Sequence, residues 1–190
     1  MNKNQLQDKI LAIIRTVFDD KKALERIHTF LMDEIYQEPE PEEIPEKYKK
    51  AVAEMADSLL TGLVCFFNPE TLEIEFIPKD LAYDPEEYEM VTGETLESAG
   101  LKHEDWPKCI DIEAMESSEA YLMMENFTDE IGDDDLRNQL LNALDRRKPF
   151  ANFKHIVENS TYRQQWFDFR QKSYEESVWN TIRFEIEQDT

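Results

Sequence analysis

Glycine is scarce in this sequence, with four residues at positions 62, 93, 100 and 132 and no two of them close together. A loop that cradles a phosphate needs closely spaced glycines, because side chains would keep the backbone N–H groups away from the ligand. A P-loop and a dinucleotide-binding loop are therefore excluded. The hydrolase, metalloprotease and redox signatures GxSxG, HExxH and CxxC do not occur either, and no cofactor is expected.

Cysteine is rarer still, since Cys65 and Cys109 are the only two. Without a spacing motif they give neither a zinc site nor a disulfide framework. Both fall in strand-like runs, which predicts buried free thiols in a reducing compartment. The first ten residues do not resemble a secretory signal, and no apolar run approaches the roughly 18 residues that span a bilayer. We therefore expect a cytoplasmic protein that does not enter a membrane.

Basic residues are outnumbered, with 21 Lys and Arg against 43 Asp and Glu and a formal net charge of −22. Such a charge argues against direct binding to nucleic acid or to an anionic membrane, because both would repel the protein. Hydrophobic residues make up 41% of the chain, including 11 Phe, 7 Tyr and 3 Trp, which is enough for a folded core. A length of 190 residues suits a single domain over 1–190, with room for a helical appendage.

The positive charge is concentrated in one segment. Residues 136–172 carry eight Lys or Arg and three acids, a local charge of +5, so the remainder of the chain carries −27. This segment could simply neutralise acidic neighbours in the fold. Alternatively, it could form a binding surface for an anion or a partner, and the sequence leaves both interpretations open.

Three consecutive amphipathic helices are predicted between residues 136 and 182. Asp133 provides a cap for the first helix, and Pro149 suits the first turn of the second, where its missing N–H costs nothing. The third begins after the break at 159–161, and its apolar stripe drifts along the helix, so its last turns could face a different partner. The predicted buried stripes contain Leu136, Leu140, Leu141, Leu144, Phe150, Phe153, Val157, Tyr162, Trp166, Phe169, Tyr174, Val178 and Ile182.

The order of short motifs along this region, SSEAY, MENF, LRNQLLNALDRRKPFANFKHIV and YRQQWFDF, resembles Uncharacterised Protein Family 0158, a bacterial family with no assigned activity. The resemblance runs from about Cys109 to Trp179, with a weaker echo over 62–78. Many relatives are expected to have Gly-Arg-Gly-Ala-Phe where this chain has Arg-Arg-Lys-Pro-Phe at 146–150. The resemblance implies a compact mixture of helices and a small sheet, and it supplies no catalytic residues.

The N-terminal third predicts helices and a hairpin. Apolar stripes over 6–18 and 24–35 predict a helical-hairpin arm at 1–36, which could pack on the chain's own core or on a second copy. An acidic, proline-rich spacer over 37–45 follows. A helix from Pro45 to Gly62, strands at 63–67 and 72–77 around the turn 68–71, and a third strand near 108–112 complete the set. The fold class is therefore α+β, mostly helical with a small antiparallel sheet.

Few residues suggest catalysis. The stretch His103-Glu104-Asp105 could ligate a metal, and Asp111 with Glu113 could exchange protons if partly buried, but both patterns are more typical of solvated surface. No metal site is predicted. The best candidate is an anion- or partner-binding site of five cations beside the N-terminus of the second helix: Arg146, Arg147, Lys148, Lys154 and Arg163.

These observations favour a soluble, non-catalytic protein-interaction or regulatory module whose partner is an acidic protein or a small anion. One alternative is a metal-assisted hydrolase or transferase, which would need a pocket lined by three or more carboxylates. Another is an acidic mimic of nucleic acid, which would need two rows of carboxylates at phosphate-like spacing. The arm at 1–36 also leaves a homo-oligomer open.

Overall fold

A computed structural model describes residues 3–18, 20–31, 34, 43–93 and 100–188, and it divides the chain into two compact units, residues 1–43 and 44–190. Each unit is described by itself. The described residues form a mostly helical α+β fold with one small antiparallel sheet, so the predicted fold class is confirmed. Among the described helices, none is both long enough and apolar enough to cross a bilayer.

The first unit consists of helix α1 (Lys3–Thr16) and helix α2 (Lys21–Phe30). A tight turn joins them, in which the Asp20 N–H donates to the carbonyl of Val17 at 3.0 Å, and the Asp20 side chain caps α2 by accepting from the N–H of Ala23. The two helices share no extended packed face, which differs from the predicted antiparallel pairing. Most of the predicted spacer, residues 37–42, lies outside the described residues.

The second unit contains the sheet. Helix α3 (Glu46–Leu60) leads through Gly62, whose φ of 89° lies in the left-handed region that favours glycine, into strand β1 (Leu63–Phe67). Strand β2 (Ile74–Pro78) and the short β3 (Ile110–Ile112) flank β1, and both run antiparallel to it. The predicted hairpin and third strand are therefore both present.

The hairpin loop is longer than the sequence suggests. The buried side chain of Asn68 accepts hydrogen bonds from the N–H groups of Glu70 and Thr71, which holds the loop closed. The prediction that Leu72 begins the second strand with its side chain buried is wrong, because Leu72 has a φ of 63° and is 36% exposed. The strand starts two residues later because the loop needs this left-handed residue to complete its turn.

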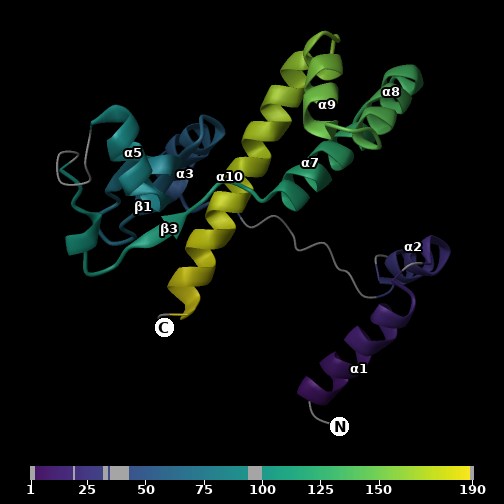
Figure 1. Cartoon of the computed structure of the whole chain (residues 1–190), viewed down its shortest axis with the longest axis horizontal. Helices are drawn as coiled ribbons and strands as arrows, with labels where there is room; N and C mark the ends of the chain where they lie inside the picture. Colours follow the sequence, from purple (N-terminus) through teal and green to yellow (C-terminus); the bar gives the residue numbers. More distant parts are fainter. Residues whose placement is uncertain (1–2, 19, 32–33, 35–42, 94–99, 189–190) are drawn as a thin grey trace. The chain divides into compact units, whose positions relative to one another are not determined.

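The remaining elements are mostly helices (Figure 1). In chain order they are α4 (Lys79–Tyr83), α5 (Pro85–Thr92), the 3-10 turn η2 (His103–Asp105), α7 (Ser117–Asp129), α8 (Asp134–Leu144), α9 (Pro149–Glu158) and α10 (Arg163–Gln188). Their starts follow the sequence signals, since the Asp133 side chain accepts from the N–H of Leu136 at 3.0 Å and Pro149 opens α9.

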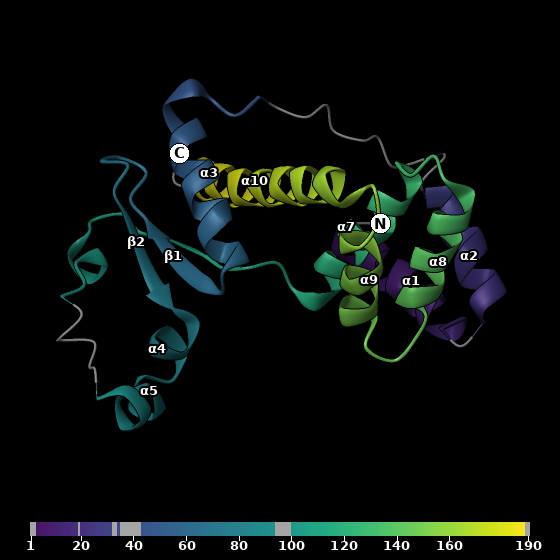
Figure 2. The ribbon, with the colours of Figure 1, turned by 90° about the horizontal axis from the view of Figure 1, so that it is seen from above.

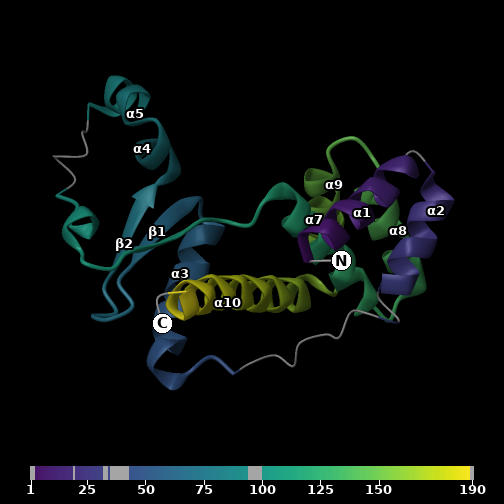
Figure 3. The same ribbon diagram turned by 90° about the horizontal axis from the view of Figure 1, so that it is seen from below.

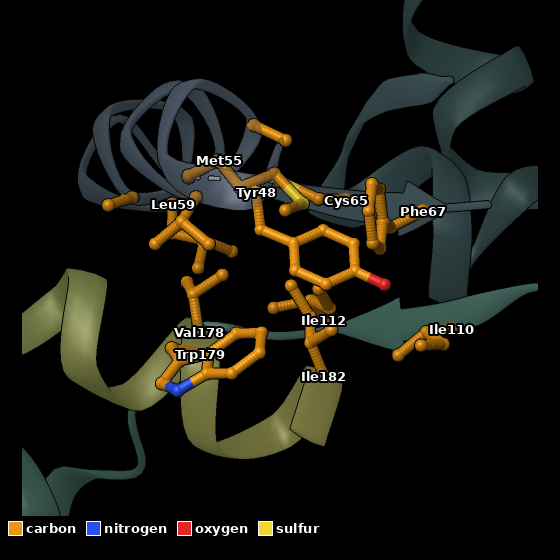
Figure 4. Close-up of a cluster of buried hydrophobic side chains, with 13 residues drawn as sticks. Tyr48, Met55, Leu59, Cys65, Phe67, Ile110, Ile112, Val178, Trp179 and Ile182 are labelled. Carbon is orange, nitrogen blue, oxygen red and sulfur yellow. Dashed lines mark hydrogen bonds between the residues drawn. The ribbon is translucent and has the colours of Figure 1, made fainter. Parts of the chain in front are cut away.

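Two large hydrophobic cores hold the second unit together, and a third, smaller cluster contains Val64, Ile77 and Leu81. The first, here called the sheet core, packs α3, β1 and β3 against the second half of α10, with Tyr48, Phe67 and Trp179 pointing toward one another (Figure 4). The second, here called the helical core, packs α7 and α9 against the first half of α10 and packs α8 against α7 and α9. Within it the rings of Phe127, Phe153 and Trp166 meet edge to face.

Helix α10 runs through both cores. Figures 2 and 3 show it beside α3 at one end and beside α7 and α9 at the other. Trp166 is buried in the helical core, Val178 and Ile182 are buried in the sheet core, and Tyr174 packs against both. The predicted drift of the apolar stripe is thus a change of packing partner along one helix of 26 residues.

Candidate functional site

All five cations of the predicted site are exposed at the surface of the second unit. Arg146, Arg147 and Lys148, here called the junction cations, form the connection between α8 and α9. Lys154 lies in the middle of α9, and Arg163 begins α10 beyond the other end of α9. Because a ten-residue helix is about 15 Å long, the structure keeps the three junction cations together and places Arg163 apart from them.

The junction is held in place by its backbone. The N–H of Arg146 donates to the carbonyl of Ala143, and Asn152 holds the next two residues, donating from its side-chain amide to the carbonyl of Arg147 and from its backbone N–H to the carbonyl of Lys148. The carbonyl groups are therefore occupied within the fold, while the three charged side chains extend into solvent.

Lys148 has an unusual backbone. Its φ of 65° and ψ of 56° place it in the left-handed region, which costs an ordinary residue about 1 kcal/mol relative to glycine. The position corresponds to the second glycine of the Gly-Arg-Gly-Ala-Phe order expected in relatives. In this chain a lysine adopts a backbone conformation that suits glycine.

The other cations of the basic segment have partners. Arg137 pairs with Asp129, Lys154 with Glu158 at 3.9 Å and Lys172 with Glu176 at 3.6 Å. The guanidinium groups of Arg163 and Arg170 lie 4.9 Å and 5.3 Å from the centre of the Phe167 ring. In the part of the chain that the structure describes, no ion pair engages Arg146, Arg147 or Lys148. Neutralisation of acidic neighbours therefore accounts for only part of the basic segment.

A second cluster lies on the face of the sheet opposite α3. The strand register sets Glu75, Phe66 and Asp111 side by side on β2, β1 and β3, so their side chains share that face. The ring of His103 stacks on Phe66, with centroids 3.9 Å apart and an interplanar angle of 13°. His103 also contacts Glu75. The sequence did not predict this contact, because residues 28 positions apart carry no local signal of pairing.

Glu75 fixes the segment that begins η2 to the sheet. Its carboxylate accepts hydrogen bonds from the backbone N–H groups of Lys102 and His103 and lies 2.8 Å from the Nδ1 atom of His103. Desolvation alone would raise the pKa of Glu75, but the hydrogen bonds from the His103 side chain and the two N–H groups outweigh it and lower that pKa. This carboxylate is therefore a structural anchor, and its charge is engaged.

The structure gives little support to the acid–base pair and the metal site that the sequence left open. Asp111 in β3 and Glu113 just after the strand are both exposed. Desolvation and the nearby carboxylate of Glu113 raise the pKa of Asp111, while His103 opposes the rise. Within the described ranges no three His, Cys, Asp or Glu side chains are grouped so that they could hold a metal ion.

The two cysteines differ from each other. Cys65 is buried in the sheet core, where desolvation raises its pKa to about 12, so it is an inert thiol. The prediction that Cys109 is buried is wrong, because it lies one residue before β3, at the exposed start of that short edge strand.

The fold and its surface define a small, mostly helical α+β protein that presents an exposed basic connection between two helices. Residues 100–188 match the model of Uncharacterised protein family (UPF0158), so the resemblance drawn from the sequence is confirmed over this part of the chain. The match includes η2, β3 and α7 to α10, with the junction cations and His103, whereas Glu75 lies outside it. Neither the curated proteins nor the solved structures contain a match to this chain.

The left-handed backbone of Lys148 predicts a stabilising substitution. Lys148→Gly should raise the free energy of unfolding by about 1 kcal/mol, because glycine adopts this conformation without strain from a Cβ atom. Lys148→Ala removes the same charge but keeps the Cβ, so it should leave stability unchanged. Urea unfolding followed by circular dichroism measures both, and equal stability of the two variants would disprove the strain.

The lowered pKa of Glu75 predicts a pH-dependent contribution to stability. Replacing Glu75 with Gln should destabilise the protein at neutral pH, because the carboxylate hydrogen bonds are lost. A carboxyl group with a lowered folded-state pKa stabilises the fold above its unfolded pKa of about 4.3, and this contribution is lost as the pH falls through the folded value.

The difference in unfolding free energy between wild type and Glu75→Gln should therefore shrink as the pH is lowered from 7 towards 3. The matched control is Glu104→Gln, which removes the charge of an exposed glutamate in the same segment whose side chain has no ion pair or hydrogen bond with the described residues. If the difference in unfolding free energy between wild type and Glu75→Gln stays constant with pH, Glu75 is not ionised in its contacts.

Proposed function

We propose that this protein is a non-catalytic interaction module whose junction cations bind an acidic segment of a partner protein. The observation that carries the proposal is that Arg146, Arg147 and Lys148 are exposed and lack an ion pair within the described residues, while other cations of the same segment are paired or lie on Phe167. Three adjacent cations kept unpaired in a chain of charge −22 are available to an external acidic group.

The backbone of the junction supports the same function. A lysine in a left-handed conformation costs stability relative to glycine, and such strained residues concentrate at functional positions. The hydrogen bonds of Asn152 hold the junction in one conformation, so little ordering cost is added when a ligand binds. Lys154 and Arg163, which have contacts of their own, would act as flanking positive charges.

An exposed aromatic side chain favours a protein segment over a bare anion. Phe150 lies two residues after Lys148 and is 42% exposed, so the prediction that it belongs to a buried stripe is wrong. Cations beside an exposed aromatic ring suit a peptide that combines carboxylates with an apolar residue, since the ring can bury that residue while the cations take the carboxylates. A small anion would bury no apolar group against the Phe150 ring.

The proposal predicts that charge reversal at the junction weakens binding of an acidic peptide. A short fluorescent peptide of Glu and Asp with one Phe should bind the full chain, and binding should weaken as salt is raised. Because each exposed ion pair contributes about 0.2–1 kcal/mol, loss of three pairs together with the new repulsion should weaken binding roughly tenfold or more in the variant Arg146→Glu/Arg147→Glu/Lys148→Glu. Fluorescence anisotropy measures the affinity.

The matched control reverses the charge at three exposed lysines elsewhere in the second unit by the substitutions Lys47→Glu, Lys50→Glu and Lys79→Glu. Its change in net charge is the same. This control should bind the peptide nearly as well as wild type. Equal losses in the two triple variants would reduce the effect to net charge and contradict a local site. Inorganic phosphate that competes as well as the peptide would show that the surface takes a small anion instead.

A further inference from the structure

The first unit has no core of its own. Within the described residues of 1–43, no side chain is buried, and both helices keep large apolar side chains in solvent. Helices of 14 and 10 residues are at or below the length of about 12–15 residues that is marginal for an isolated helix in water. The exposed apolar residues are Leu6, Ile10, Leu11, Ile13, Phe18, Phe30 and Leu31.

Three of these residues follow the spacing of a packing face. Leu6, Ile10 and Ile13 recur at intervals of four and three on α1, and the half-buried Leu24 and Ile27 have the same spacing on α2. The side of α1 opposite this stripe carries small or polar residues such as Ala12 and Thr16. A face of this kind is stable only when another apolar surface covers it.

The net charge of residues 1–36 favours a second copy over a membrane or a strongly charged partner as the surface that covers this apolar face. Residues 1–36 contain six Lys or Arg and six Asp or Glu, so they have no net charge, whereas residues 37–190 contain 15 against 37. A neutral face lacks the excess of cations that draws an amphipathic helix to an anionic membrane, and it offers no charge to a strongly acidic or basic partner. A second copy of the same face is equally neutral and equally apolar.

The remainder of each chain would oppose contact with its copy. Two surfaces that each carry −22 repel one another, so residues 1–36 are the region through which two copies can meet at the lowest electrostatic cost. A two-fold axis would place identical stripes face to face, and two pairs of helices around one shared core make a four-helix arrangement.

We infer that residues 3–31 are a self-association arm, in which the apolar stripe of α1 and α2 is buried against the same stripe of a second copy. This surface is separate from the junction cations, and it does not depend on their binding to a partner. The arm supplies the apolar contact, and its neutrality lets two acidic chains approach.

The test is the mass of the full chain in solution, measured by light scattering after size exclusion over a range of concentrations. Wild type should approach twice the chain mass of 22.6 kDa. Ile13→Asp puts a carboxylate into the proposed core and should raise the dissociation constant at least roughly a hundredfold. Ala12→Asp adds the same charge at the neighbouring position on the opposite face and should leave the dimer intact.

A wild-type chain that keeps the mass of one copy at every concentration would overturn the inference, as would equal masses for the two aspartate variants. A dimer that dissociates in high salt would point to ionic contacts and would also overturn it. The tryptophan fluorescence melt of the second unit completes the test, because Trp166 and Trp179 both lie in its cores. If Ile13→Asp lowers that melting temperature and Ala12→Asp does not, the stripe packs on its own chain and the inference is wrong.

Discussion

The second unit depends on one continuous helix. Helix α10 has 26 residues, about 39 Å of length, and it is the element that contributes buried side chains to both the helical core and the sheet core. Trp166 serves the first core and Trp179 the second, while Tyr174 packs against both. Each core alone is small, so a break in the middle of α10 would separate two clusters that are too small to be stable by themselves.

This arrangement explains where the chain can present charge. The helical core buries the apolar sides of α7 and α9 against α10 and that of α8 against α7 and α9, and the connection between α8 and α9 stays at the surface. The junction cations lie in this connection, where Asn152 and the first turn of α9 fix the backbone. A binding surface on a connection held by a rigid helical scaffold combines exposure with a defined conformation. The Glu75 anchor fixes the segment at η2 in the same way on the sheet side.

Periodicity was enough to predict the helices and the hairpin, because each depends on local spacing and capping. The drift of the stripe between Phe169 and Tyr174 even indicated the change of packing partner along α10. The left-handed backbone of Leu72 could not be predicted, because it follows from how the side chain of Asn68 closes the hairpin loop.

The candidate site was predictable only in part. The excess of cations at the α8–α9 connection is visible in the sequence, but whether each cation has a partner depends on the fold, as Lys154 and Arg163 illustrate. The contact of Glu75 with His103 joins two segments that come together only when the sheet forms. Pairing between distant residues depends on tertiary structure, and neither spacing nor composition encodes it directly.

Hydrogen exchange along α10, read by mass spectrometry on the unaltered chain, tests the shared helix most directly. If α10 couples the two cores, the amides of residues 168–178 should exchange as slowly as those of α3 and α7, because all of them open only when the whole unit unfolds. Exchange in 168–178 that is faster by more than roughly tenfold, about 1.4 kcal/mol, would show that the helix opens between the cores and would contradict the account.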